Sequence, residues 1–273
     1  MEKKNVAAFF DRCASWWDAD MIRNEPIIAT ILDNAGVKAG TDVLDVACGT
    51  GVLFPDYLDR QVASVTGIDI STEMVKVAAG KFPQVNVVCG DVEEYPFEKQ
   101  FDVVMVYNAF PHFPDPAALI KNLAALVKPG GRLSIAHGMS RAQLQQHHAG
   151  RAAAVSIDLI HEQELAALMA PYFDVDVVIS DERMYQVCGV RLEGEDFSRV
   201  PVKAEVTPLE ELVALMRFTV SHNDAHAREM AELADQLREA GKIGAYRRIM
   251  DAVADFDVLN AKMEAVLTEL EEE

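Results

Sequence analysis

A buried apolar strand that runs directly into a glycine turn constrains this chain more than any other feature. Residues 43–51 read VLDVACGTG, so an apolar run meets Gly49 and Gly51. Glycine adopts backbone dihedrals that other residues avoid and carries no Cβ, so main-chain N–H groups can face a ligand closely. Phe54 stands where a dinucleotide fingerprint has its third glycine. The turn therefore predicts a nucleotide-type cofactor site and argues against NAD or FAD.

Alternating apolar runs and helical periodicity predict a sheet of parallel strands covered by helices on both faces. The expected strands are 42–47, 64–69, 85–89, 102–107, 132–137, 175–179 and 185–192. The expected helices are 9–17, 27–35, 51–60, 72–81, 116–127 and 161–172. This rhythm is typical of an α/β fold.

Polar and proline residues between 193 and 208 interrupt the apolar pattern, and everything after them has helical spacing. Helices are expected at 209–220, 222–240 and 244–270, with Gly241 as a break between the last two. The chain is therefore predicted to contain a first domain over 1–193 and a small all-helical domain over 208–273.

Composition excludes several classes of partner. The formal net charge of -19 opposes binding to nucleic acid or to anionic membranes, because both require a basic surface. No apolar run approaches the ~18 residues of a membrane span, and the polar start does not resemble a signal peptide. Four scattered cysteines without paired spacing are predicted to be buried free thiols. We expect a cytoplasmic protein that binds neither nucleic acid nor membrane.

Further motifs follow the glycine turn in order. They are 67–74 (GIDISTEM), 90–92 (GDV), 102–108 (DVVMVYN) and 126–133 (LVKPGGRL). With these motifs, residues 5–192 resemble the class I S-adenosylmethionine-dependent methyltransferases, and segment 109–116 is similar to the ubiquinone/menaquinone-methyltransferase-like branch. The resemblance implies a Rossmann-like, seven-stranded, mostly parallel sheet and S-adenosyl-L-methionine as the cofactor.

The resemblance also implies roles for single residues. Asp45 would orient the amino-acid end of the cofactor, and Asp69, about 20 residues after the turn, would accept both ribose hydroxyls. Asp91 and the Val92 N–H would bind adenine. The other implied cofactor contacts are Ala47, Cys48, Gly49, Gly51, Ile70, Met74 and Asn108. Of these, Gly49 is expected to tolerate substitution least on steric grounds.

Each role has a structural alternative. A carboxylate at the end of a strand often caps the next helix, which would account for Asp69 and Asp91 without a ligand. Met74 fills an apolar gap equally well. His112 follows the fourth strand and is the candidate catalytic base, because imidazole accepts a proton near neutral pH. Its alternative is a structural histidine in the pocket wall.

Two additions to the sheet are predicted to bind the substrate. The first is the segment 9–18, which resembles the lid helix of the same branch; one of Trp16 and Trp17 should pack on the sheet domain while the other borders the pocket. The second is a long polar loop over 140–158. The candidate substrate-binding residues are Trp17, Phe110, Arg141, His147 and His148.

The C-terminal helices carry His222 and His226, which share one helix face and could bind a metal ion, with Asn223 and Asn260 nearby. Two imidazoles are an incomplete zinc site, so packing of the helices or a homodimer through them is the favoured alternative. We predict an enzyme that methylates a small molecule. The alternative is a cofactor-binding or metal-sensing regulatory protein that keeps the methyltransferase fold without turnover.

Overall fold

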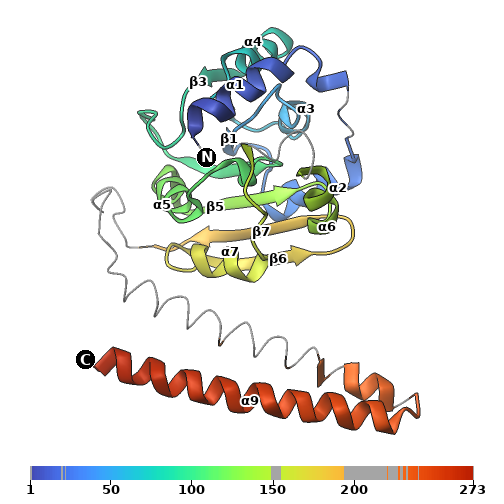
Figure 1. Ribbon diagram of the computed structural model, residues 1–273. Coiled ribbons are helices and arrows are strands. Elements are labelled where there is room, and N and C mark those ends of the chain that lie inside the picture. Colours follow the sequence, from blue (N-terminus) through green and yellow to red (C-terminus); the bar gives the residue numbers. More distant parts are fainter. Residues whose placement is uncertain are drawn as a thin grey trace. The chain divides into compact units, whose positions relative to one another are not determined.

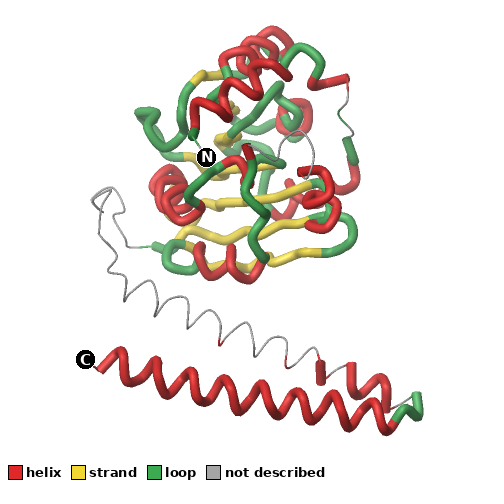
Figure 2. The backbone as a smooth tube through the Cα atoms, in the orientation of Figure 1, coloured by secondary structure: helices red, strands yellow, loops and turns green. Residues whose placement is uncertain are grey.

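A sheet of seven strands in the order β3-β2-β1-β4-β5-β7-β6 organises the N-terminal part of the chain. The computed structural model describes residues 2–19, 21, 23–148, 155–193, 220, 227, 230–231, 233–238 and 240–272. The strands are β1 Asp42–Val46, β2 Ser64–Asp69, β3 Asn86–Cys89, β4 Phe101–Tyr107, β5 Val127–His137, β6 Phe173–Ser180 and β7 Tyr185–Arg191. The strands lie side by side in one sheet (Figure 2), and of these seven only β7 runs opposite to the others, so the predicted mostly parallel, Rossmann-like sheet is confirmed.

Helices cover both faces of this sheet. Their bounds are α1 Lys3–Cys13, α2 Glu25–Asn34, α3 Phe54–Asp59, α4 Thr72–Lys81, α5 Pro116–Leu126, α6 Arg141–His148 and α7 Glu162–Met169, with short 3-10 turns η1 Trp17–Ala19 and η2 Phe110–His112 (Figure 1). Side chains of α5 and α7 pack in one apolar cluster, whereas those of α2, α3 and α4 pack in another. Along β1, Leu44 and Val46 enter the first cluster and Val43 enters the second, which is the alternation expected of a strand.

The start of the chain differs from the prediction. The first helix covers Lys3–Cys13 rather than 9–17, and the chain then turns before η1. Lysine and alanine residues at positions 3–8 are good helix formers, whereas the apolar run at 9–17 continues past the helix end. The tryptophans therefore do not share one regular helix.

Two further expectations need correction. The segment after β5 is not only a loop, because α6 occupies its first half. Cys13, Cys48 and Cys188 are buried free thiols, as predicted, but Cys89 is exposed. Cys89 ends β3, which is the edge strand of the sheet, so nothing on its outer side buries it.

The chain divides into two compact units, Met1–Arg199 and Val200–Glu273. In the second unit, a long helix α9 spans Ile243–Glu272, and residues 233–238 are helical. Gly241 between them has a φ of 74°, a left-handed conformation that ends helices, in agreement with the predicted break. The Asn260 side chain donates a hydrogen bond to the Val220 carbonyl, so the chain folds back on itself here. Among the described helices, none has the length and apolar character needed to cross a membrane.

Candidate functional site

A cavity of about 650 Å³ opens at the carboxyl ends of the central parallel strands. It is lined by residues that follow β1, β2, β3 and β4 and is closed on another side by α1 and η1. The order of the sheet reverses between β1 and β4, because β2 and β3 lie on one side of that pair and β5 lies on the other. Open α/β sheets bind ligands at such a reversal, and the volume suits a small molecule.

Asp69 ends β2 and lies at the wall of this cavity, with 8% of its surface exposed. Its Oδ2 accepts a hydrogen bond from the Gly49 backbone N–H at 2.8 Å, and its Oδ1 accepts one from the Ser71 N–H at 2.8 Å. Burial nevertheless raises the pKa of Asp69 to about 6. Each carboxylate oxygen still has a second acceptor position, so the side chain can serve both the loop and a ligand.

The glycine turn contains two positions with different functions. At Gly49, φ is +54° and no atom lies within 4 Å of where a Cβ would stand. At Gly51, φ is +83° and a Cβ would lie 2.6 Å from the Phe54 ring. The neighbouring protein atoms require glycine at Gly51, whereas Gly49 faces open space, so the expected steric role of Gly49 toward a ligand stays a prediction.

Two residues other than glycine hold positive φ values at this edge of the sheet. Ala47 follows β1 with a φ of 52°, and Asn108 follows β4 with a φ of 54°. Asn108 is held by its Oδ1, which accepts a hydrogen bond from the Gly138 N–H at 2.9 Å. Both residues line the cavity. Such sparsely populated backbone conformations persist where the surrounding structure enforces them, and they cluster at ligand sites.

Polar contacts attach the N-terminal segment to the loops that follow three neighbouring strands. Lys3 Nζ pairs with Asp91 Oδ2 at 2.6 Å, Ser71 Oγ donates to Asp11 Oδ1 at 2.6 Å, and Thr50 Oγ1 donates to Asp18 Oδ1 at 2.5 Å. Lys3 also pairs with Glu93. In Figure 1, α1 lies beside α4, with which it packs. The segment therefore covers the cavity as a lid.

The lid contributes an aromatic wall. Phe9, Phe10, Trp16 and Trp17 line the cavity from this side. The Phe10 ring packs edge-on against Trp17 at 5.6 Å and against the His112 ring at 4.9 Å. Both tryptophans border the cavity, so the expectation that only one would do so is wrong. The reason is the turn between α1 and η1, which removes the constraint of a shared helix.

His112 lies at the end of η2 and lines the cavity. Its Nδ1 is 2.8 Å from the Val155 carbonyl oxygen and 3.2 Å from Ser156 Oγ. A carbonyl oxygen can only accept, so the short contact places the proton of the neutral ring on Nδ1 and leaves the lone pair on Nε2. This is the tautomer that a base acting through Nε2 requires.

Residues 44–135 match the family model described as "Methyltransferase domain". The ubiquinone biosynthesis O-methyltransferase of Coxiella burnetii (strain RSA 493 / Nine Mile phase I) is 34% identical over 143 residues, which are 49% of this chain and 61% of that enzyme. The enzyme of the same name from Escherichia fergusonii is 35% identical over 143 residues, or 48% of this chain and 59% of its own length. This part of the chain is similar to methyltransferase domains.

Solved structures agree with this domain at the level of the fold. The N-methyltransferase NodS from Bradyrhizobium japonicum WM9, in complex with S-adenosyl-L-homocysteine, superimposes with a TM-score of 0.55 at 13% identity, covering 69% of this chain and 100% of NodS. DhpI in its SAH complex gives a TM-score of 0.54 at 20% identity over 70% of this chain and 98% of DhpI. The predicted class I methyltransferase fold is thereby confirmed.

Residues 212–270 match a different family model, described as "Domain of unknown function (DUF8180)". His222 and His226, predicted as metal ligands, and Asn223 lie outside the described residues. Within the part of the chain that is described, no group of three or more His, Cys, Asp or Glu side chains is arranged to hold a metal ion.

Most of the predicted residues meet at the cavity beside the strand ends. Those that line it are Ala47, Cys48, Gly49, Asp69, Ile70, Met74, Asp91, Val92, Asn108, His112 and Trp17. Asp45 is 2% exposed and lies behind the wall, next to Val46. Burial raises the pKa of Asp45 well above its ordinary value, the Asp69 charge adds to the rise, and the Tyr57 hydroxyl opposes it.

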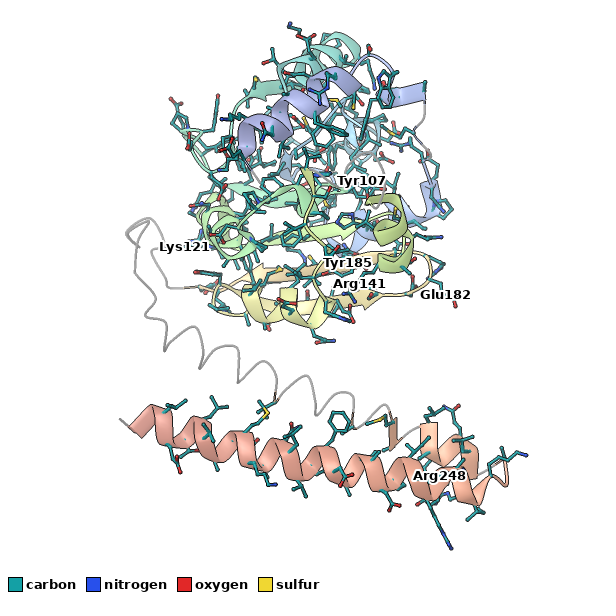
Figure 3. The ribbon with its side chains drawn as sticks, in the orientation of Figure 1. Tyr107, Lys121, Arg141, Glu182, Tyr185 and Arg248 are labelled. Atoms are coloured by element: carbon teal, nitrogen blue, oxygen red, sulfur yellow. The ribbon has the colours of Figure 1, made fainter. Side chains whose placement is uncertain are left out.

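Three predicted positions lie elsewhere. Phe110 is 1% exposed and packs in the apolar core, because η2 turns it inward while His112 remains at the cavity. Arg141 donates to the Leu159 carbonyl at 2.9 Å and lies near Tyr185, as Figure 3 shows, so it supports α6 rather than a ligand. Gly51 borders a neighbouring hollow instead. The side chains of His147 and His148 lie outside the described residues.

One face of the lid was not predicted from the sequence. Lys3, Val6, Phe10 and Cys13 all line the cavity. Their spacing of three, four and three residues places them on one stripe of a helix. That periodicity was readable in the sequence and extends toward the chain start, where the helix forms.

Proposed function

We propose that the chain transfers a methyl group from S-adenosyl-L-methionine to a small-molecule acceptor. The observation that carries the proposal is the open cradle at Gly49 beside the buried carboxylate of Asp69, within a cavity of about 650 Å³. When bound, the cofactor supplies an electrophilic methyl group on a positively charged sulfur. The match to this chain spans 61% or less of the length of the curated relatives described above. Their substrates therefore do not define its acceptor.

The residues of the strand ends would hold the cofactor. Asp69 accepts the ribose hydroxyls with the acceptor positions that its loop contacts leave available. Asp91 and the Val92 N–H receive the adenine, beside Met74, which is 1% exposed. The backbone at Gly49 accommodates the methionine part. A carboxylate bound to two hydroxyls is a charge-assisted contact and gives both affinity and orientation.

The lid would provide the acceptor side of the cavity. Its aromatic rings exclude water and hold an acceptor in line with the methyl group, and such alignment supplies much of the acceleration in a displacement reaction. His112 is the proposed base, because its Nδ1 contact with Val155 leaves Nε2 as the proton acceptor. The acceptor compartment also contains Arg23, whose charge is compensated by ion pairs with Glu25 and Asp56.

We also propose a cytoplasmic location and a division into a methyltransferase domain over 1–193 and a helical domain over 208–273. Four free thiols suit a reducing compartment. The split between Arg199 and Val200 and the separate family match over 212–270 support the division. A homodimer through the C-terminal helices completes the proposal.

The test is an activity screen. Purified chain is incubated with S-adenosylmethionine and fractions of a small-molecule extract, and S-adenosylhomocysteine is measured by mass spectrometry. We expect one fraction to support its formation, and His112→Gln to reduce the rate while Asp69→Ala reduces cofactor affinity. Cofactor binding without turnover in any fraction would contradict the enzyme and favour a regulatory protein. Absence of binding would contradict both.

A further inference from the structure

Helix α9 carries a heptad pattern over its whole length. Eight of its buried and half-buried residues follow one another in steps of three and four: Tyr246, Ile249, Val253, Phe256, Asn260, Met263, Leu267 and Leu270. Apolar residues at this spacing form the seam of a coiled coil. The hydrogen bond from Asn260 to the Val220 carbonyl shows that this seam faces Val220 of the same chain.

A second apolar stripe runs beside the first, and its C-terminal half is exposed. It consists of Ala245, Ala252, Leu259 and Val266, which are spaced by seven residues. Leu259 is 47% exposed and Val266 is 43% exposed. Together with the half-buried Ile249, Phe256, Met263 and Leu270, these residues repeat every three and four positions and make a second seam. A helix with two adjacent seams can pack against two neighbours at once.

We propose that this second seam binds α9 of another copy of the chain in antiparallel orientation, so that the C-terminal units form a homodimer. The inference deepens the homodimer of the proposed function; it rests on the C-terminal unit alone and is independent of methyl transfer. An antiparallel pair of identical helices has twofold symmetry, so each contact occurs twice. The residues that flank the seam near one end of the helix must then carry charges opposite to those of the flanking residues near its other end, because these face each other across the dimer.

The flanking charges meet this requirement. Residues at the outer border of the seam are Arg248, Asp255, Lys262 and Glu269, which alternate in sign at intervals of seven. All four are exposed, and Figure 3 shows Arg248 projecting outward from α9. In antiparallel register, Arg248 faces the partner's Glu269, and Asp255 faces the partner's Lys262. Such flanking pairs set orientation and partner choice in coiled coils.

The same register aligns the apolar residues. It places Phe256 against the partner's Leu259 and Ile249 against the partner's Val266, while Met263 meets the partner's Ala252. Large residues thus face smaller ones across the seam, the arrangement that fills space between two helices without gaps. One register therefore satisfies both the charges and the packing, which argues for a second copy of this chain rather than an unrelated partner.

The first experiment measures the mass of the full chain in solution by light scattering and sedimentation at about 50 μM, because self-association depends on concentration. We expect a dimer. Leu259→Glu should weaken it by at least about tenfold in dissociation constant, since the substitution places a charge in the seam. Val258→Glu is the matched control: Val258 is 54% exposed but lies outside the seam, so the dimer should persist.

The second experiment tests the register and does not depend on a seam substitution that could disturb folding. Arg248→Glu should weaken the dimer, and adding Glu269→Arg should restore it, because the reversed pair is again complementary. Circular dichroism verifies that each variant stays helical. A monomeric wild-type chain would overturn the proposal, as would equal effects of Leu259→Glu and Val258→Glu. If the double variant dimerises no more tightly than Arg248→Glu alone, the antiparallel register is overturned.

Discussion

The two walls of the cavity are built in different ways. The strand-end wall uses Gly49, Asp69 and Asp91, which lie at or just after the ends of β1, β2 and β3 and are held by hydrogen bonds with backbone N–H groups. The lid wall uses aromatic side chains of α1 and η1, which are attached to the sheet through exposed or partly exposed ion pairs and hydroxyl contacts. We therefore expect the strand-end wall to stay fixed when the cofactor binds, and the lid wall to move when the acceptor enters.

The glycines of the strand-end wall should give the largest difference between two neighbouring positions. Gly51→Ala combines a strained φ with a clash against Phe54, so we expect a loss of about 2 to 5 kcal/mol in the free energy of unfolding. Gly49→Ala meets no protein atom and should cost about 1 to 2 kcal/mol, yet lose most cofactor affinity. Denaturant unfolding and calorimetry measure the two quantities. Equal loss of stability in both variants would contradict the distinction between cradle and packing site.

Asp69→Ala should weaken binding of S-adenosylhomocysteine by about 1.5 to 3 kcal/mol, or roughly 10- to 150-fold, because it removes a charge-assisted contact. Asp174→Ala, an exposed carboxylate on β6, is the control and should bind normally. Calorimetry gives both affinities. If Asp69→Ala binds as well as the control, Asp69 only organises the loop through Gly49 and Ser71.

Acidification should weaken the strand-end wall in particular. The pKa of Asp69 is about 6, above the ordinary value, so lowering the pH from 7 to 5 protonates the side chain that accepts the ribose hydroxyls. The ionised fraction falls about tenfold over this interval, and cofactor affinity should fall by the same factor. Asp69→Asn should bind weakly at both pH values. A wild-type affinity that stays constant between pH 5 and 7 would show that the ionised form is not required.

The lid should give the smallest effect. Lys3→Met removes the ion pairs with Asp91 and Glu93, and a partly exposed pair contributes about 0.2 to 1 kcal/mol. Cofactor release should therefore accelerate by no more than about fivefold. Stopped-flow tryptophan fluorescence measures it, because Trp16 and Trp17 border the cavity. Lys4→Met is the control, since Lys4 pairs only with the exposed Glu2. Identical release rates in both variants would show that the ion pairs of Lys3 do not hold the lid in place.

The strand-end wall could be predicted from the sequence, because apolar strand patterns and glycine turns are signals carried by neighbouring residues. The bounds of β2 and α4 agree with the expected ranges, and Asp69 lies where the motif order predicted it. The lid was less predictable, since the apolar run at 9–17 hid a helix end at Cys13 and a turn. Whether Phe110 or His112 faces the cavity depends on the short turn η2. The exposure of Cys89 depends on which strand forms the edge of the sheet. Such features are set by tertiary packing rather than by local pattern.

A crystal structure of the full chain with bound S-adenosylhomocysteine would test the central claim most directly. The account predicts the ribose hydroxyls within hydrogen-bonding distance of Asp69, the adenine at Asp91 and Val92, and the amino-acid end against the open side of Gly49, with the aromatic lid above an empty acceptor compartment. A ligand bound outside this cavity, or one inside it whose ribose does not contact Asp69, would contradict the account.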